Sequence, residues 1–310
     1  MRIFLGFDGG GTKTECVAID EEARVVGTGK AGASNPTRIG FESAGKAVEA
    51  TADMALGEAG APRSDVVSIC AGLAGTGQPE NRQRMETLLS AAFPGAAIQI
   101  LMDLELPLAA MNEGPAIVLV AGTGSAAIGR DAEGNVARVG GFGRDVSDEG
   151  SAYDVGRSAV EAATREHANT GRDSPLGRQI LRQLGCRDWS EVQQRIAADR
   201  DAVYPRVFPV VAAAADAGDE SARTLLTDAA DKLAALAGRL SQQLGLGGAP
   251  FDLAKTGGMI GRSAHFDQVL AASLEKAAPG ARAATLLFPP AEAAARLALH
   301  SASRKREKVQ

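Results

Sequence analysis

The chain begins with a short apolar run that leads directly into a glycine-rich turn. Residues 3–14 read Ile3-Phe4-Leu5-Gly6-Phe7-Asp8-Gly9-Gly10-Gly11-Thr12-Lys13-Thr14. A second β-type run, Glu15 to Ile19, follows, and after an acidic turn a third run, Arg24 to Gly27, completes a β-meander. Glycines at the end of a strand let another group approach the backbone amides closely, so this first turn (Gly9–Thr14) predicts a ligand-facing loop.

The same pattern returns later in the chain. The apolar run Ile117 to Val120 leads into a second turn, Gly122-Thr123-Gly124-Ser125, and two further β-type runs follow it. Two copies of one meander predict a duplicated architecture of two lobes, which agrees with a length of 310 residues. We expect an N-terminal lobe over residues 1–113, which the last helix, 290–310, could complete, and a C-terminal lobe over residues 114–289.

Composition excludes several classes of function. Lys and Arg number 33 against 38 Asp and Glu, giving a net charge of −5, so nucleic acid and membrane surfaces are not expected partners. No apolar run approaches the roughly 20 residues of a membrane helix, and no signal-peptide pattern is found. The three cysteines, Cys16, Cys70 and Cys186, form no CxxC pair. We therefore expect a cytoplasmic protein without disulfides or a cysteine-ligated metal.

The two turns could hold the phosphates of a nucleotide through their backbone amides, with hydroxyl groups and one lysine adding further donors. The residues expected to contact the nucleotide here are Gly10, Gly11, Thr12 and Lys13 of the first turn and Gly122, Thr123 and Gly124 of the second. Asp8 precedes only the first turn, and one carboxylate there could hold Mg²⁺ through its water shell. Two tight hairpin turns, with Asp8 as a turn former, are the alternative.

Neither turn fits the better-known nucleotide motifs. A P-loop is absent because Thr12 separates Gly11 from Lys13. The loose fingerprint Gly122-x-Gly124-x-x-Ala127 is followed by a hairpin, whereas a dinucleotide-binding fold needs a helix at that point.

Five motifs, in order along nearly the whole chain, resemble those of a known family. They are Phe7-Asp8-Gly9-Gly10-Gly11-Thr12-Lys13-Thr14, Gly122-Thr123-Gly124-Ser125, Gly140-Gly141-Phe142-Gly143, Ser147-Asp148-Glu149-Gly150-Ser151-Ala152-Tyr153 and Thr256-Gly257-Gly258. The chain resembles the N-acetylglucosamine kinase branch of the BadF/BadG/BcrA/BcrD group, in the actin/hexokinase/Hsp70 superfamily. The resemblance implies an α/β, two-lobed actin-like ATPase (ribonuclease H-like) fold, with duplicated mixed sheets flanked by helices and an interlobe cleft.

The resemblance also implies cofactors and site residues. It implies ATP and Mg²⁺, an adenosine motif at Gly257 and Gly258, and Ala215 lining the adenine side. It implies that Asp103, which follows an apolar run, is the base that accepts the proton of the sugar hydroxyl. Without the resemblance, Asp103 would fit an ordinary N-cap equally well. The implied sugar ligands are Asn35, Asp103, Ser125, Gly141, Phe142 and Asp148; a turn is the alternative for Asn35, which precedes a proline.

The departures from the family pattern lie on the sugar side. Phe142 stands where the family usually has Trp, Ser147 where it has Gly, Leu104 is bulkier than the usual residue, and Arg144 occupies a variable position. We expect an ATP-dependent kinase that phosphorylates the 6-hydroxyl of N-acetylglucosamine or a related amino sugar. The resemblance is compatible with a homodimer, which is common among such kinases. Glucosamine or another hexose is an alternative acceptor. Two other classes remain: an ATPase activator of a CoA-thioester dehydratase or reductase, and a sugar sensor without catalysis.

Overall fold

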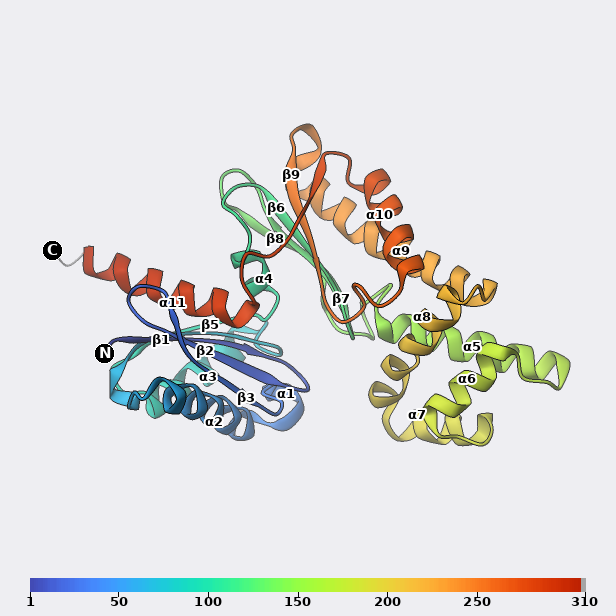
Figure 1. Cartoon of the computed structure of the whole chain (residues 1–310), viewed down its shortest axis with the longest axis horizontal. Helices are drawn as coiled ribbons and strands as arrows, with labels where there is room; N and C mark the ends of the chain where they lie inside the picture. The colour runs from blue at the N-terminus through green and yellow to red at the C-terminus, as the bar shows by residue number, and fades with distance from the viewer. Residues whose placement is uncertain (308–310) are drawn as a thin grey trace. The chain divides into compact units, whose positions relative to one another are not determined.

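The computed structural model describes residues 1–307, which form two compact units. Unit 1 contains Met1–Asn112 and the C-terminal segment from Leu286, and unit 2 contains Glu113–Thr285. Each unit has a mixed five-stranded sheet flanked by helices (Figure 1). Among the described residues, no helix combines the length and apolar character that a membrane span requires.

Unit 1 is built on the sheet β3-β2-β1-β4-β5, in which β4 and β5 run parallel to β1 and the meander β1–β3 is antiparallel. Alternate residues of β1 face opposite sides: Ile3, Leu5 and Phe7 join the core with the helices α2 and α3, and Phe4 joins α11. The elements are β1 (Ile3–Gly9), β2 (Thr14–Ile19), β3 (Val25–Ala31), α1 (Pro36–Ile39), α2 (Phe41–Ala59), η1 (Arg63–Asp65), β4 (Val66–Leu73), α3 (Pro79–Ala92), β5 (Ala97–Leu101), α4 (Glu105–Ala109) and α11 (Pro290–Glu307).

Helix α11 reaches β1 because Gly6 has no side chain. A Cβ on Gly6 would lie 2.0 Å from the backbone nitrogen of Ala295, so only glycine allows this contact. The end of the chain thus covers the sheet that its beginning forms, as Figure 1 shows for the red helix α11 beside β1.

Unit 2 repeats this topology. Its sheet has the order β10-β9-β6-β7-β8, with β9 and β10 parallel to β6 and an antiparallel meander β6–β8. The predicted class of duplicated mixed sheets flanked by helices is confirmed. The elements are β6 (Ala116–Ala121), β7 (Ser125–Arg130), β8 (Val136–Gly140), α5 (Ala152–Thr170), α6 (Pro175–Leu184), α7 (Trp189–Val203), η2 (Tyr204–Arg206), α8 (Phe208–Asp216), α9 (Glu220–Gln243), η3 (Leu246–Gly248), β9 (Phe251–Thr256), α10 (Ala264–Ala277) and β10 (Ala281–Ala284).

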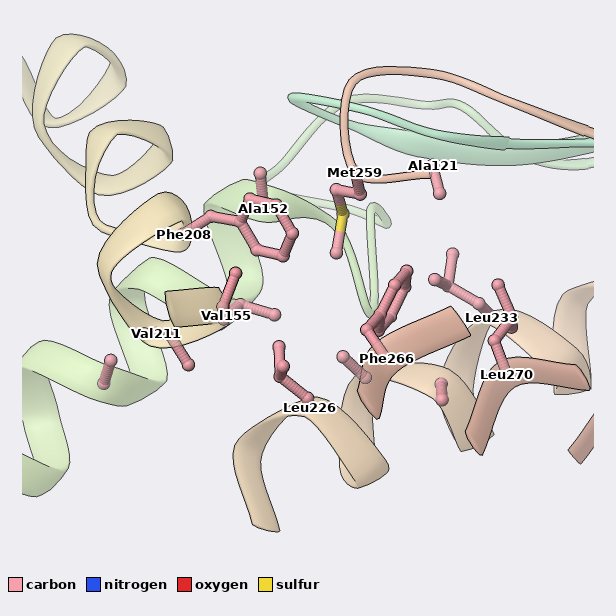
Figure 2. Close-up of a cluster of buried hydrophobic side chains, with 14 of the residues drawn as sticks. Ala121, Ala152, Val155, Phe208, Val211, Leu226, Leu233, Met259, Phe266 and Leu270 are labelled. Carbon is pink, nitrogen blue, oxygen red and sulfur yellow. The ribbon is translucent and has the colours of Figure 1, made fainter. Parts of the chain in front are cut away.

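The core of unit 2 lies beneath its glycine-rich loops. Phe208 and Phe266 meet edge to face, with ring centroids 6.2 Å apart and an interplanar angle of 77°. Figure 2 shows the buried Met259 pointing from its loop into the same cluster. Because Met259 directly follows Gly257 and Gly258, its burial anchors the predicted adenosine motif to the core.

Candidate functional site

Two carboxylates lie at one edge of the sheet in unit 1. Asp8 is near the carboxyl end of β1, and Asp103 follows β5. Strands β1, β4 and β5 are parallel, so their carboxyl ends share an edge, and β1 and β5 are two strand spacings, or about 10 Å, apart. Burial, followed by the negative charges of Asp103 and Glu15, raises the pKa of Asp8 to about 6. A cation bound here would stabilise the ionised form of the Asp8 carboxylate.

The first turn is held by loops from elsewhere in unit 1. The amide of Gly10 donates to the carbonyl of Lys13 (2.9 Å), and the carbonyl of Gly10 accepts from the amides of Ser34 and Asn35 (3.0 and 3.2 Å). The loop after β4 joins through the amide of Ala74, which donates to Gly9 (2.8 Å). These backbone hydrogen bonds hold the first turn in its shape.

The cation predicted for this turn is already paired. The Lys13 ammonium lies 2.9 Å from a carboxylate oxygen of Glu15, and the Lys30 ammonium lies 2.7 Å from the same oxygen. The structure thus directs Lys13 towards Glu15. Thr12 is exposed within the turn.

Local hydrogen bonds orient the side chains of Asn35 and Asp103. The side-chain oxygen of Asn35 caps α1, accepting from the amide and hydroxyl of Thr37 (3.0 and 2.7 Å), so a ligand would meet its amide NH₂. One carboxylate oxygen of Asp103 accepts from the amide of Leu104 (3.1 Å). Helix α4 has Leu104 as its N-cap, so Asp103 lies outside the helix and is not a capping residue.

In unit 2 the second turn is covered by Asp148. A carboxylate oxygen of Asp148 accepts from the amide of Ser125 (3.1 Å), and a Cβ on Gly124 would lie only 2.8 Å from the other oxygen. The backbone of Asp148 has a φ of +74°, unusual for a residue with a side chain. Burial raises the pKa of this carboxyl. A side chain at residue 124 would therefore push the Asp148 carboxylate away from the turn.

Helix α5 and the loop after β8 also form hydrogen bonds with the second turn. The amides of Ala152 and Tyr153 donate to the carbonyls of Gly122 and Thr123 (2.9 and 3.3 Å). The amide of Gly141 donates to the carbonyl of Ser125 (3.1 Å). The ring of Phe142, next in the chain, is 59% exposed. Segments predicted separately at residues 122–125, 140–143 and 147–153 thus meet at one place.

The predicted adenosine motif lies against the same turn. Gly257 has a φ of +111°, and a Cβ on it would lie 2.3 Å from the carbonyl oxygen of Ala121, so no other residue fits. A Cβ on Gly122 would lie 3.7 Å from the amide nitrogen of Gly258. A pocket of about 320 Å³ joins the two motifs; its lining residues are Gly122, Thr123, Ala152, Pro205, Phe208, Pro209, Gly258 and Arg262.

Ala215 does not line this pocket. Its side chain is fully buried in α8, and the contact with the adenine side that the resemblance implies for it stays a prediction. The adjacent Asp216 has a different role, because its carboxylate accepts from the Ser263 hydroxyl (2.7 Å) and the His265 amide (3.0 Å). The end of α8 thereby holds the loop that carries Gly257 and Gly258.

Sequence reasoning missed several lining residues. Pro205, Phe208 and Arg262 line the pocket, yet they lie outside the five motifs. Nothing in their local sequence marks them, because only the packing of η2, α8 and the loop after β9 brings them together.

Sequence comparisons find two amino-sugar kinases similar to this chain. An N-acetyl-D-glucosamine kinase of Dictyostelium discoideum is 26% identical over 318 residues, covering 97% of this chain and 98% of that protein. An N-acetylmuramic acid/N-acetylglucosamine kinase of Clostridium acetobutylicum is 31% identical over 182 residues, but that match spans 58% of this chain and only 60% of the relative.

Solved structures show the same fold. A crystal structure of a candidate N-acetylglucosamine kinase from Chromobacterium violaceum has a TM-score of 0.80 at 26% identity, covering 96% of this chain and 99% of that one. A glucokinase of Streptomyces griseus, solved with glucose and AMPPNP, shares the fold with a TM-score of 0.62 at 18% identity, covering 96% and 99% of the two chains. The model of one family matches residues 5–295, and the chain belongs to this BadF/BadG/BcrA/BcrD ATPase family.

Proposed function

We propose that the protein is an ATP-dependent kinase that transfers the γ-phosphoryl group to the 6-hydroxyl of N-acetylglucosamine or a related amino sugar. The observation that carries the proposal is the placement of Asp8 and Asp103 at the strand edge where the first glycine turn begins. Membership of an ATPase family supports the use of ATP. The relatives named above support an amino sugar as acceptor.

Asp103 would act as the general base. As the sugar oxygen bonds to the γ-phosphorus, the bond to the bridging oxygen of ADP breaks and Asp103 accepts the hydroxyl proton. Phosphoryl transfer asks little more of the protein than positioning and charge compensation. The backbone amides of Gly11 and Thr12 in the first turn, and those of Thr123 and Gly124 in the second, would bind the phosphates. The amides of Gly10 and Gly122 shape the two turns instead, because they donate to the carbonyls of Lys13 and Gly124 (2.9 Å each).

Asp8 would hold Mg²⁺ through water. The residues fit this ion, because Mg²⁺ keeps most of its water shell and commonly uses only one or two carboxylates. Within residues 1–307 no group of three His, Cys, Asp or Glu side chains is placed to form a protein-only metal site. The raised pKa of Asp8 marks a carboxylate that lacks a compensating charge. When bound, the ion would neutralise charge on the phosphate oxygens.

The remaining predicted residues divide between nucleotide and sugar. We propose that Gly257 and Gly258 border the nucleoside in the pocket of unit 2, which Arg262 and Phe208 also line. Asp148, with Asn35, Ser125, Gly141 and Phe142, would contact the sugar. The two units would correspond to the two predicted lobes. A homodimer and a cytoplasmic location stay predictions, which light scattering and cell fractionation would check.

The proposal is tested by ADP release with a panel of sugars. N-acetylglucosamine, glucosamine, N-acetylmannosamine, N-acetylmuramic acid and glucose are each supplied with Mg·ATP. We expect acceptor-dependent ADP release with at least one amino sugar. ATP hydrolysis that no sugar stimulates would instead favour the activator class, and sugar binding without any turnover would favour a sensor.

A further inference from the structure

An arginine outside all the motifs lies over the first turn. Arg38 belongs to α1, which follows Asn35, and its side chain is exposed. A Cβ on Gly11 would lie 2.8 Å from Nη1 of Arg38 and 3.6 Å from its Cδ. The guanidinium and the side-chain stem therefore lie directly against Gly11, and the absence of a side chain there makes the room for them.

The charge of Arg38 is uncompensated, unlike that of the nearby lysines. Lys13 and Lys30 are both paired with Glu15. In the part of the chain that the structure describes, no hydrogen bond or ion pair engages the Arg38 side chain. A guanidinium stays protonated at any physiological pH, and its fork of N–H donors matches two oxygens of a phosphate. The turn that the sequence assigned to phosphate thus has a free cation, and that cation is Arg38 rather than Lys13.

The position of Arg38 indicates which phosphate it would meet. The first turn directly follows Asp8, and the charge of Asp103 acts on Asp8, so the turn lies on the side where the hydroxyl is deprotonated. Arg38 is also close to a residue that is expected to bind the sugar. The amide of Arg38 in α1 donates to the carbonyl of Asn35 (3.1 Å). If the proposed function holds, a group at this place would lie next to the phosphorus that is transferred.

We propose that Arg38 binds the oxygens of the transferring γ-phosphoryl group. The inference rests on the proposed kinase function and adds a catalytic residue to it. Charge develops on those oxygens as the phosphoryl group moves, so a guanidinium that binds them stabilises the transition state as well as bound ATP. Lys13 remains with Glu15 and contributes less.

The test compares nucleotides with and without the third phosphate. Calorimetry measures the binding of Mg·AMPPNP and Mg·ADP to the wild type, Arg38→Gln and Arg38→Lys. For Arg38→Gln we expect AMPPNP to bind roughly ten- to a hundredfold more weakly, the range for a lost hydrogen bond to a charged group, and ADP to bind almost unchanged. Arg38→Lys should recover part of the loss, because lysine keeps the charge without the fork.

Lys46→Gln is the matched control, since it removes one positive charge from an exposed position on α2. It should leave the affinity for both nucleotides unchanged. Equal weakening of AMPPNP and ADP by Arg38→Gln, or no weakening, would overturn the inference. So would an equal effect of Lys46→Gln, which would indicate general electrostatics.

The binding comparison keeps the two proposals separate. If the wild type binds AMPPNP but transfers no phosphoryl group to any sugar, the kinase proposal fails while the nucleotide comparison still decides the role of Arg38. If the wild type turns over and Arg38→Gln keeps its full kcat and its preference for AMPPNP, only the inference about Arg38 fails.

Discussion

At the scale of single residues, Asp8 and Asp103 bring negative charge to a place that is partly shielded from water. Burial and the charge of Asp103 raise the pKa of Asp8 to about 6, against 3.8 for an unperturbed aspartate. Ionisation of Asp8 therefore destabilises the fold without ligand. This destabilisation is absent below about pH 4, grows between about pH 4 and pH 6, and is complete above about pH 6. The site thus keeps at neutral pH a charge that a bound cation would compensate.

The substitution Asp8→Asn should stabilise the protein that lacks ligand. The shift from 3.8 to about 6 corresponds to about 1–3 kcal/mol in the free energy of unfolding at pH 7.5. Urea unfolding measures the difference between variant and wild type. The gain should vanish at pH 4, where Asp8 is protonated; a variant that is less stable at pH 7.5 would contradict this electrostatic explanation.

The substitution Asp103→Asn should remove the base and keep the shape of the loop. An asparagine can still accept the hydrogen bond that the amide of Leu104 donates. We expect kcat to fall about 100-fold or more, the usual range for a lost general base, with the affinity for Mg·ADP little changed. Steady-state kinetics and calorimetry measure both quantities. Undiminished kcat would show that another group accepts the proton.

At the scale of elements, an ion pair between α5 and α9 supports the loop of Asp148. The Asp154 carboxylate accepts from the amide of Gly150 (3.0 Å) and lies 3.0 Å from the Lys232 ammonium. Lys232 also lies 2.6 Å from Asp228, which is on the surface. Asp154 is thus placed to hold the backbone two residues after Asp148.

Asp154→Asn and Asp228→Asn form a matched pair of variants. The side chain of Asp154 is 10% exposed and that of Asp228 is 57% exposed. We expect Asp154→Asn to lower the free energy of unfolding by about 1–3 kcal/mol and to weaken sugar binding, and Asp228→Asn to change stability by less than about 0.5 kcal/mol. Equal losses in urea unfolding would contradict a special role for the α5–α9 pair.

A glycine pair tests the contact between β6 and the loop after β9. Both Gly257 and Gly134 have positive φ, but only Gly257 has a backbone atom, the Ala121 oxygen, where a Cβ would stand. Gly134→Ala should cost about 1–2 kcal/mol through its backbone conformation alone. Gly257→Ala should cost more and weaken Mg·ADP binding. Similar unfolding midpoints for the two variants would argue against the close approach at Ala121.

At the scale of the whole molecule, the sequence predicts the duplicated fold because its strongest signals are local. Each meander is a set of short apolar runs with glycine or acidic turns between them, and both meanders are found where expected. The sequence pattern does not predict separate helices between residues 171 and 216, although this segment forms α6, α7 and α8. Its apolar residues pack against α5 and α9. Because many different apolar residues can fill such positions, the segment carries no distinctive sequence motif.

The candidate site was predictable only in part, for a related reason. Motifs in which glycine allows close contacts, such as those with Gly124 and Gly257, can be recognised from the sequence. The pairing of Lys13 with Glu15, the burial of Ala215 and the position of Arg38 over Gly11 depend on how separate segments pack. No local pattern encodes such contacts, so they required the structure.

The most direct test of the central claim is to identify the phosphorylated product. The protein is mixed with Mg·ATP and N-acetylglucosamine, and the reaction is followed by ³¹P NMR. We predict that the ATP signals give way to those of ADP and, in equal amount, to a phosphomonoester coupled to the methylene protons of C6. Inorganic phosphate in place of the ester, or an ester coupled to a ring proton, would contradict phosphoryl transfer to the 6-hydroxyl.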